Sequence, residues 1–515
     1  MIGELILLGI ISSVSSQMLH HMMTPEELNN IFSVKNSAEV PTYDVVPVSI
    51  TKPRNRRYND LYLTTTRFGE NLKLWLTPLD GILVGENVPI LSLYHNPAYS
   101  WEPKMINHTG DVKLFLPLMY ENTLHATTVA VNNHPNGRHT LTGYIGNSYI
   151  QPVPPRLMEH ARRRRSLNNT LEHEFDNQIY HIIRKIPETD VKFQSQAIEI
   201  PAMRNTTSRS KRLFPQIVYP EVLVIVDFNY SAFIGNHSID KLIYLMAFWN
   251  GVDMRFRSLE NPRVRLNIAG FIFAEDTKVL PYMQIKNGLL TNSGHQLRYK
   301  GNWWYGLQGY FPINYDLAVT MTPFRLCDGF PRKCNILGQA YVQGACLVDH
   351  NKRTIDKVAF VRDRGAYDGI QTAAHELGHL FGMKHDGQEN KNCPDENGYI
   401  MTTYDKFTPQ AFDWSNCSLI DMHNYLRSER GWCLYNYPKQ GEPVRRYLPG
   451  RRMNADEQCK MLVNGTATVI DDHICAQLKC SESDGWALPE AAEGTPCGSG
   501  KLCLHGKCVL ETKIV

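Results

Sequence analysis

The clearest alternation of hydrophobic and polar positions lies in residues 213–436. Glu221–Asp227 is a nearly continuous apolar run with an acid at each end, which is typical of a buried central strand. Apolar residues then recur at helical spacing in Ile239–Asn250, and Val264–Phe273 and Asp316–Thr322 are further strand patterns. This alternation of strands and helices predicts an α/β core, and roughly 220 residues are enough to bury one.

The pattern of residues 17–212 is different. Short apolar stretches such as Val112–Leu116 and His139–Ile150 are separated by Pro, Gly and Asn turns, as in a series of strands. We therefore expect a β-rich region in front of the α/β core.

Residues 1–16 have the features of a signal peptide. An apolar run, Leu5–Ile11, is followed by Val14 and Ser16, a small-residue pair that suits signal-peptidase cleavage, although Glu4 stands where a basic residue is usual. The run is shorter than the roughly 20 residues needed to span a bilayer, and no other stretch reaches that length. The sequence predicts a secreted, extracellular protein without a transmembrane segment.

Composition and charge narrow the class of protein. The chain has 515 residues, of which 43% are hydrophobic and 20% charged, as in globular proteins of two to four units. A formal charge of +3 is too small for this length to indicate binding to nucleic acid or to a membrane surface.

The cysteines indicate an oxidising compartment. All 12 lie at Cys327 or later, with six up to Cys433 and six after it, and an even number in each part favours disulfides. The spacing alone leaves their pairing open. A glycoprotein is consistent with the sequons at Asn107, Asn168, Asn205, Asn229, Asn236, Asn416 and Asn464.

The candidate chemistry lies in Thr372–Asp386, which contains the pattern H-E-x-x-H. On a helix, His375 and His379 project from one face and can bind one metal ion together. Glu376 then lies beside the metal, where it can hold and deprotonate a bound water without being a ligand. We interpret Glu376 as the general base.

A third ligand follows the helix. Gly382 can adopt the positive φ that ends a helix sharply, so the chain can turn back and present His385. Three protein ligands leave one position of a Zn²⁺ ion open to water, as in catalytic sites, whereas a structural zinc is closed by four. The alternative is a chance H-E-x-x-H on an unrelated helix, and Gly382 and His385 argue against it.

The complete pattern resembles a known family. The metzincin signature is matched by the three histidines, Gly382 and the later Ile400–Met401. With Asp386 directly after the third histidine, the pattern resembles the reprolysin (adamalysin) branch of zinc endopeptidases. The resemblance implies a metzincin fold for residues 213–436, namely a mixed twisted sheet with a zinc-binding helix. It also implies that Met401 is an apolar floor under the zinc ligands.

The resemblance implies a mode of substrate binding as well. One segment of this chain resembles the family's edge strand, which runs along the active-site cleft. It consists of Gly338, Gln339, Ala340, Tyr341 and Val342. An edge strand has free N–H and C=O groups, so an extended peptide can pair with it. Nearby, Trp303, Trp304 and Tyr305 could form a recognition patch, but aromatic clusters are more often core, and we interpret them so.

The thrombospondin-type branch of the family implies further features. The disulfides would join Cys327 to Cys334, Cys346 to Cys433 and Cys393 to Cys417. A structural Ca²⁺ would be bound by an all-oxygen set. These ligands would be Glu221, Asp316, the Cys433 carbonyl and Asn436. The alternative for Glu221 and Asp316 is that they only cap strands.

Residues 437–515 resemble the disintegrin-like, cysteine-rich module that follows the protease in the same branch. Such a short segment buries little core and needs disulfides. Two cysteines of the family module are missing here, and the sequence contains no R-G-D. A short secreted architecture of this kind is similar to the salivary metalloproteases of ticks.

Arg209, Lys211 and Arg212 form an R-x-K-R run, which is typical of cleavage by a furin-like convertase and would end a pro-domain of residues 17–212. The alternative is a solvated basic patch. Because the pro-domain has no cysteine, a thiol on the zinc cannot keep the precursor inactive. Latency would come from the folded pro-domain covering the cleft.

Together these features predict a secreted zinc metalloendopeptidase. By resemblance its substrates would be fibrinogen, fibrin or matrix proteins, in an anti-haemostatic salivary role. Two alternatives remain open at this point. One is a protease that remodels the extracellular matrix of its own organism, and the other is a binding protein in which the cysteine-rich module dominates.

Overall fold

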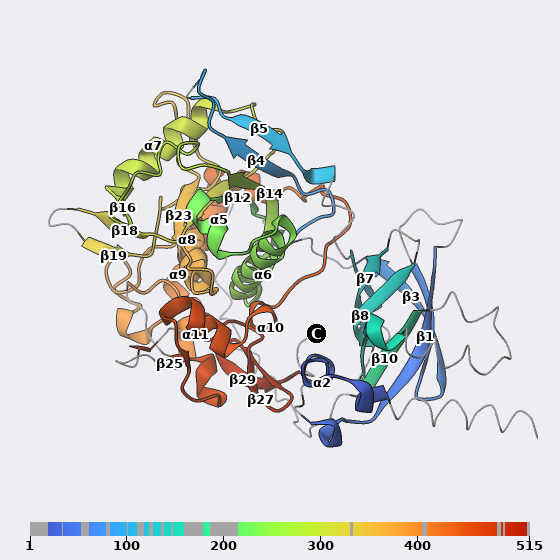
Figure 1. Cartoon of the computed structure of the whole chain (residues 1–515). Helices are drawn as coiled ribbons and strands as arrows, with labels where there is room; N and C mark the ends of the chain where they lie inside the picture. Colours follow the sequence, from blue (N-terminus) through green and yellow to red (C-terminus); the bar gives the residue numbers. More distant parts are fainter. Residues whose placement is uncertain are drawn as a thin grey trace, which may run out of the picture.

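The computed structural model describes residues 19–511 except 33, 35, 53–60, 79–82, 100, 111–117, 123–126, 135–137, 146–147, 159–178, 186–214, 330–332, 404–408, 482–485 and 488–489. The signal peptide, Val112–Leu116 and the R-x-K-R run lie outside the described residues. Figure 1 shows an N-terminal barrel, a larger mixed domain and a small C-terminal module beneath the latter.

The mixed domain is organised around a seven-stranded sheet. In spatial order its strands are β20 (Gly338–Ala340), β23 (Val358–Arg362), β17 (Leu317–Thr322), β12 (Glu221–Val226), β14 (Asn267–Ala274), β4 (Ile90–Tyr94) and β5 (Lys104–Asn107). Neighbouring strands from β23 to β4 are parallel, and only the outermost strands, β20 and β5, run antiparallel to their neighbours. The expected α/β core is confirmed.

Helices cover both faces of this sheet. On one face Val222, Val224 and Val226 pack with helices α6 (Ser238–Arg257) and α8 (Ile370–Leu380). On the other face Leu223 and Ile225 pack with α7 (Ser293–Gly306). Burial on both faces explains why β12 is apolar at successive positions instead of alternating. Within α7, Trp303 and Trp304 are buried in this core.

The mixed domain has further elements, most of which are short. Its other helices are α5 (Phe228–Phe233) and α9 (Asn416–Arg427), with 3-10 turns at Asp395–Asn397, Pro409–Phe412 and Glu429–Tyr435. Its other strands are β11 (Ile217–Val218), β13 (Arg263–Val264), β15 (Ile285–Lys286), β16 (Leu289–Thr291), β18 (Arg325–Asp328), β19 (Lys333–Ile336), β21 (Val348–Asp349) and β22 (Thr354–Ile355).

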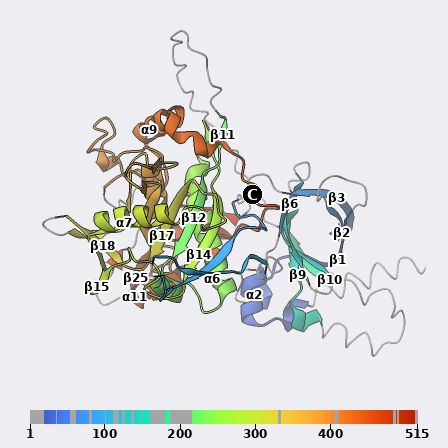
Figure 2. The same ribbon diagram turned by 90° about the horizontal axis from the view of Figure 1, so that it is seen from above.

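The N-terminal region forms a closed antiparallel barrel, which confirms the expected β-rich region. The barrel strands are β1 (Tyr43–Thr51), β2 (Leu61–Arg67), β3 (Glu70–Pro78), β6 (Leu118–Asn122), β7 (Thr127–Asn133), β8 (His139–Ile145), β9 (Ser148–Pro152) and β10 (Ile179–Lys185). Three short helical elements precede the barrel strands. They are the helix α2 (Pro25–Phe32) and the 3-10 turns Leu19–Met22 and Ser37–Glu39. Figure 2 shows the barrel beside the mixed domain from a second direction.

The C-terminal module is held together by disulfides, as expected for so short a segment. Its bridges are Cys459–Cys480, Cys475–Cys503 and Cys497–Cys508. Its elements are α10 (Pro449–Arg452), α11 (Ala455–Val463), the 3-10 turn Asp472–Cys475, and β24 (Thr466–Ala467), β25 (Lys479–Ser481), β26 (Trp486–Ala487), β27 (Pro496–Gly498), β28 (Lys501–Leu504) and β29 (Lys507–Leu510). None of the helices in the described part of the chain is long and apolar enough to cross a membrane.

Candidate zinc site

Helix α8 supplies two of the three candidate ligands and the candidate base. The helix ends at Leu380, and Gly382 follows with a φ of +94°, a conformation that side chains rarely allow. A Cβ at Gly382 would also lie 2.7 Å from the Cβ of Tyr425 on α9. Glycine at this position therefore permits the close turn that brings His385 back towards α8.

The three imidazoles converge. The Nε2 atom of His385 lies 3.1 Å from that of His379 and 3.2 Å from that of His375. On the far side of two rings, Nδ1 of His375 is 2.8 Å from the Ile400 carbonyl and Nδ1 of His379 is 2.9 Å from the Met383 carbonyl. Because a carbonyl only accepts, Nδ1 carries the proton and Nε2 keeps its lone pair.

This arrangement fits a Zn²⁺ ion. Burial lowers the pKa of His375 to about 4, that of His379 well below its ordinary value, and that of His385 less strongly. The rings are therefore neutral at pH 7, which is the form that binds a metal. Lone pairs that face one another repel, so a cation between them stabilises the arrangement, and three ligands leave one position open.

The Glu376 carboxylate is buried beside the histidines. Its Oε2 atom has no hydrogen-bond partner among the described residues, and burial raises its pKa well above the usual value. Its Oε1 atom faces β20, since a Cβ at Gly338 would lie only 2.4 Å from it. The expected base thus packs directly against the expected substrate strand, and glycine at position 338 permits this close approach.

Met401 lies where the apolar floor was expected. It is fully buried, and a Cβ at Gly378 of α8 would lie 2.7 Å from its sulfur. The preceding Ile400 carbonyl accepts the His375 hydrogen bond. The turn at Ile400–Met401, which we call the Met-turn, therefore contacts the zinc helix from below and orients one ligand. The requirement for Gly378 was not visible in the sequence, because its contact is with a distant residue.

Two family models match the chain. Residues 329–438 match the model "Reprolysin (M12B) family zinc metalloprotease", and residues 449–509 match "ADAMTS cysteine-rich domain 2". The first match contains the three converging histidines. Residues 329–438 are therefore similar to the reprolysin (M12B) family, and with its three histidines this segment belongs to a zinc metalloendopeptidase. The expected enzyme class is thereby confirmed.

Similar proteins come from several animals. A Bombyx mori protein named "A disintegrin and metalloproteinase with thrombospondin motifs like" is 29% identical over 86% of this chain and 72% of its own length. The Mus musculus protein "A disintegrin and metalloproteinase with thrombospondin motifs 12" is 35% identical over 39% of this chain and 13% of its own length. "Venom metalloproteinase 3" of Eulophus pennicornis is 28% identical over 42% of this chain and 52% of its own length. None of these three relatives supports a tick origin.

Among solved structures, an archaemetzincin from Methanopyrus kandleri covers 41% of this chain and 97% of its own, with 17% identity and a TM-score of 0.26. The strand order and the three histidines, and not this likeness, identify the fold as metzincin-like.

The turn that carries His385 is anchored at Asp386. This buried carboxylate accepts a hydrogen bond of 2.7 Å from Ser415 Oγ, and Ser415 caps the start of α9. The Asp386 backbone N–H donates to the Met401 carbonyl at 3.0 Å. Asp386 therefore connects the third ligand, the Met-turn and α9, a role that the sequence did not reveal because these partners are distant along the chain.

The edge strand is shorter than expected. Strand β20 covers Gly338, Gln339 and Ala340 and pairs with β23. Tyr341 and Val342, expected in the same strand, lie beyond its end. The strand stops because the chain turns at Gln343, whose φ is +63°, and the Gln343 N–H donates to the His379 carbonyl at 2.8 Å.

The structure forms the three disulfides that the resemblance implied. Cys327–Cys334 joins β18 to β19, and Cys393–Cys417 holds the segment after His385 against α9. Cys346–Cys433 links the chain after β20 to the end of the domain. Two of the bridges thus brace segments that adjoin the site.

The expected calcium ligands lie together at one cavity, which Glu221, Asp316, Cys433 and Asn436 line with Lys357. Asp316 accepts the Glu221 backbone N–H at 2.9 Å, and the Asn436 amide donates to the Glu221 carboxylate. Burial raises the pKa of Asp316 to about 7 and raises that of Glu221. Two desolvated carboxylates with further oxygens nearby fit a cation, while the bond to the start of β12 also fits strand capping.

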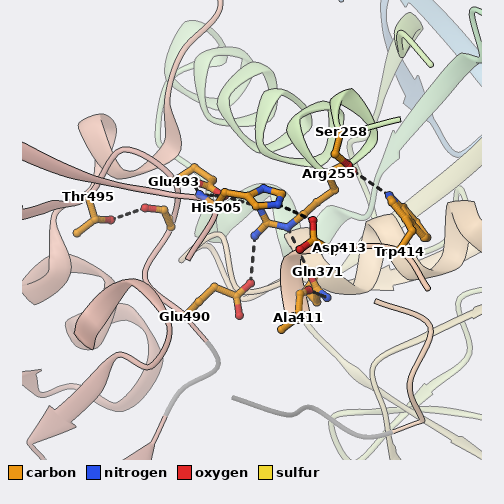
Figure 3. A network of polar contacts seen from close by, with 11 residues as sticks. Arg255, Ser258, Gln371, Ala411, Asp413, Trp414, Glu490, Glu493, Thr495 and His505 are labelled. Carbon is orange, nitrogen blue, oxygen red and sulfur yellow. Dashed lines mark hydrogen bonds and ion pairs between the residues drawn. The ribbon is translucent and has the colours of Figure 1, made fainter. Parts of the chain in front are cut away.

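A polar network joins the protease to the C-terminal module (Figure 3). Arg255, in the last turn of α6, is 1% exposed and forms ion pairs with Glu490 and Glu493 of the module. Its Nε donates to Gln371 of α8 at 3.3 Å. No sequence signal distinguished Arg255 from an ordinary basic residue on a helix surface.

The same network reaches the Met-turn. His505 of the module lies 2.8 Å from the Asp413 carboxylate, and Trp414 donates to the Arg255 carbonyl at 2.8 Å. The Asp413 carbonyl in turn accepts the Ile400 N–H at 3.0 Å. The module therefore contacts the segment that holds the zinc ligands in place.

Proposed function

We propose that this zinc metalloendopeptidase is secreted and cleaves extracellular proteins that bind as an extended strand along β20. The single observation that carries the proposal is that Gly338 of β20 adjoins the Glu376 carboxylate beside the three histidines. All 12 cysteines are paired, which suits an oxidising compartment.

The chain's own residues divide the work of peptide hydrolysis. Zinc, held by Nε2 of His375, His379 and His385, would supply a water of lowered pKa and polarise the scissile carbonyl. Glu376 takes the proton of that water and later gives it to the leaving amine. Burial raises the pKa of the Glu376 carboxyl well above its usual value, which favours a group that can accept a proton and later give it back.

Substrate binding follows from the position of β20. It is the last strand of its sheet and pairs on one side with β23, so a peptide can pair along the other side. Such pairing uses main-chain groups, and the absence of a side chain at Gly338 allows the Glu376 carboxylate to lie against the strand with which the substrate would pair. Met401 supports the site from below and takes no part in the reaction.

The substrates that we propose are fibrinogen, fibrin or matrix proteins. The test is incubation of the purified protein with fibrinogen, fibronectin and gelatin, with and without a zinc chelator. Cleavage of at least one of them that stops with chelator supports the proposal, and a lack of cleavage of all three contradicts it. Tissue of expression then separates an anti-haemostatic salivary role from remodelling of the animal's own matrix.

We also propose that Glu221, Asp316, Asn436 and the Cys433 carbonyl bind a structural Ca²⁺. This cation would join β12 to the end of the domain. Added Ca²⁺ should raise the thermal unfolding temperature of chelator-treated protein, and Asp316→Asn should remove the increase while the exposed-site control Glu260→Gln keeps it. Equal increases in both variants would contradict the site.

Finally, we propose that a furin-like convertase cuts after Arg212. Replacement of Arg209, Lys211 and Arg212 by alanine should leave the precursor uncut and inactive, as judged by gel and by peptide hydrolysis. A fully active, uncut precursor would contradict both the cut and the latency.

A further inference from the structure

The N-terminal region contributes more than a barrel. Strand β4 lies parallel to β14 with Ile90 opposite Phe271 and Leu93 opposite Ala274, and β5 pairs with β4 on the outside. In Figures 1 and 2 this blue strand pair lies against the green strand β14. The sequence placed residues 17–212 in a unit in front of the protease, yet part of that unit completes the protease sheet.

Backbone hydrogen bonds along the whole of β14 hold this segment. The N–H groups of Ile268, Phe271 and Glu275 donate to the carbonyls of Leu83, Pro89 and Leu93 at 2.7, 2.8 and 2.9 Å, respectively. If residues 83–107 left, these three donors, two in β14 and one directly after it, would lose their partners, and β14 would become an exposed edge.

The side chains of β4 belong to both cores of the protease. Leu91 and Leu93 are fully buried in the core that contains α7. Ile90, with Val84 and Val88 before it, is buried in the core that contains α6 and α8. Loss of this segment would expose apolar surface on both faces of the sheet, which is strongly unfavourable in water.

Polar contacts fix both ends of the segment. At its start, the Asn87 N–H donates to the Gln440 carbonyl at 3.0 Å, and the Gln440 side-chain amide donates to the Ile268 carbonyl at 2.7 Å. At its other end, the His95 N–H donates to Asp276 at 2.6 Å, and the Tyr310 hydroxyl donates to the Pro103 carbonyl at 2.6 Å. Residues on both sides of the cleavage run thus share one bonded unit.

We propose that residues 83–107 are a permanent strand pair of the catalytic sheet, so that a cut at Arg209–Arg212 yields a two-chain enzyme and does not release the N-terminal region. This inference rests on the cut in the proposed function. All six disulfides join residues from Cys327 onward, so the two chains are held without a covalent bond. Strands β4 and β5 lie at the opposite side of the sheet from β20, so this strand pair does not itself cover the proposed substrate strand, and the proposed latency of the uncut precursor is assigned to another part of the N-terminal region.

The test uses the full chain with an N-terminal affinity tag and a site-specific protease sequence in place of Arg209–Arg212. After complete cleavage, the two halves should bind the affinity resin together in native buffer and separate on a denaturing gel without reductant. The catalytic half in the flow-through would overturn the proposal. Natural processing is tested separately with furin on the unaltered chain, so its failure leaves this result intact.

Hydrogen exchange shows which contact retains the halves. The amides of Ile268, Phe271 and Glu275 should exchange as slowly after cleavage as before it. Fast exchange at these amides in halves that still co-elute would mean that the barrel alone holds them, which overturns the proposal.

A matched pair of variants completes the test. Leu93→Ala removes a buried side chain of β4, whereas Tyr94→Ala changes the next residue, which is 38% exposed. Release of the cleaved catalytic half should be at least tenfold faster for Leu93→Ala and unchanged for Tyr94→Ala. Equal release rates for the two variants would contradict the role of β4.

Discussion

At the scale of single residues, the site depends on a few close contacts between distant parts of the chain. Gly338 and Glu376 are far apart in sequence, yet a Cβ at Gly338 would lie 2.4 Å from Oε1 and 2.6 Å from Cγ of Glu376. A side chain here must displace the base or the substrate strand. Glycine is therefore required at position 338 by the close packing of the Glu376 side chain, and not by a backbone conformation that only glycine adopts.

The corresponding prediction is that Gly338→Ala lowers kcat/KM by at least tenfold while zinc content stays near that of the unchanged protein, and that the overpacked side chain also costs about 1–3 kcal/mol of stability. A displacement of the base of about 1 Å is enough for such a loss. Gly306→Ala is the control, because a Cβ there meets nothing within 4 Å. Kinetics on a peptide substrate decide the matter, and full activity of Gly338→Ala would show that β20 and Glu376 do not share the cleft.

At the scale of elements, the zinc helix was predictable and the sheet order only in part. His375, Glu376 and His379 lie within one helix, so spacing alone places them on one face. Strands β12 and β17 could also be predicted, from their apolar runs. The place of strand β4 in the sheet could not be predicted, because its partner β14 is about 180 residues away and a parallel pairing leaves no local turn signal.

Other site features were missed for the same reason. The contacts of Gly378 with Met401 and of Asp386 with Ser415 join segments whose proximity only the fold establishes. The end of β20 at Ala340 depends on a left-handed residue, Gln343, that is not a glycine, so the usual turn signal is absent.

A buried histidine in the barrel makes the stability of the protein depend on pH. His181 of β10 is fully buried, and its Nε2 accepts the Leu141 N–H at 2.9 Å, so burial lowers its pKa to about 4. The folded barrel prefers the neutral ring, whereas the unfolded chain binds a proton near pH 6.5. The contribution of the neutral His181 to the free energy of unfolding is therefore fully present above pH 6.5. It is lost as the pH falls from 6.5 to 4, which lowers the stability by up to about 3 kcal/mol.

We predict that the urea midpoint of the barrel falls between pH 7 and pH 4.5, and that His181→Gln removes most of this pH dependence at the cost of a lower midpoint at pH 7. Circular dichroism in urea at the two pH values measures both. An equally strong pH dependence in His181→Gln would assign the effect to other groups.

At the scale of the whole molecule, the protease and its module form one structure. Arg255 and Glu493 are 1% and 2% exposed, and truncating one partner leaves a buried charge without its counter-ion. The module also reaches the Met-turn through His505 and Asp413. We therefore expect the module to unfold together with the protease domain.

Arg255→Gln should accordingly destabilise the protein by about 3–5 kcal/mol, which is the usual cost of breaking a buried pair. The control, Lys352→Gln, removes an exposed partner of Asp349 and should change stability by less than about 1 kcal/mol. Thermal unfolding of both variants gives the comparison, and equal stabilities would indicate that the Arg255 network does not join the two parts.

Hydrolysis depends, in the proposed function, on one zinc ion held by three histidines and on Glu376, which moves the proton. The measurement that tests it most directly is zinc content by mass spectrometry together with peptide hydrolysis, for the unchanged protein, Glu376→Ala and His385→Ala. We expect one zinc per chain in the first two, a loss of hydrolysis by several orders of magnitude in Glu376→Ala, and weakened zinc binding in His385→Ala. Zinc lost from Glu376→Ala, or held undiminished by His385→Ala, would contradict it.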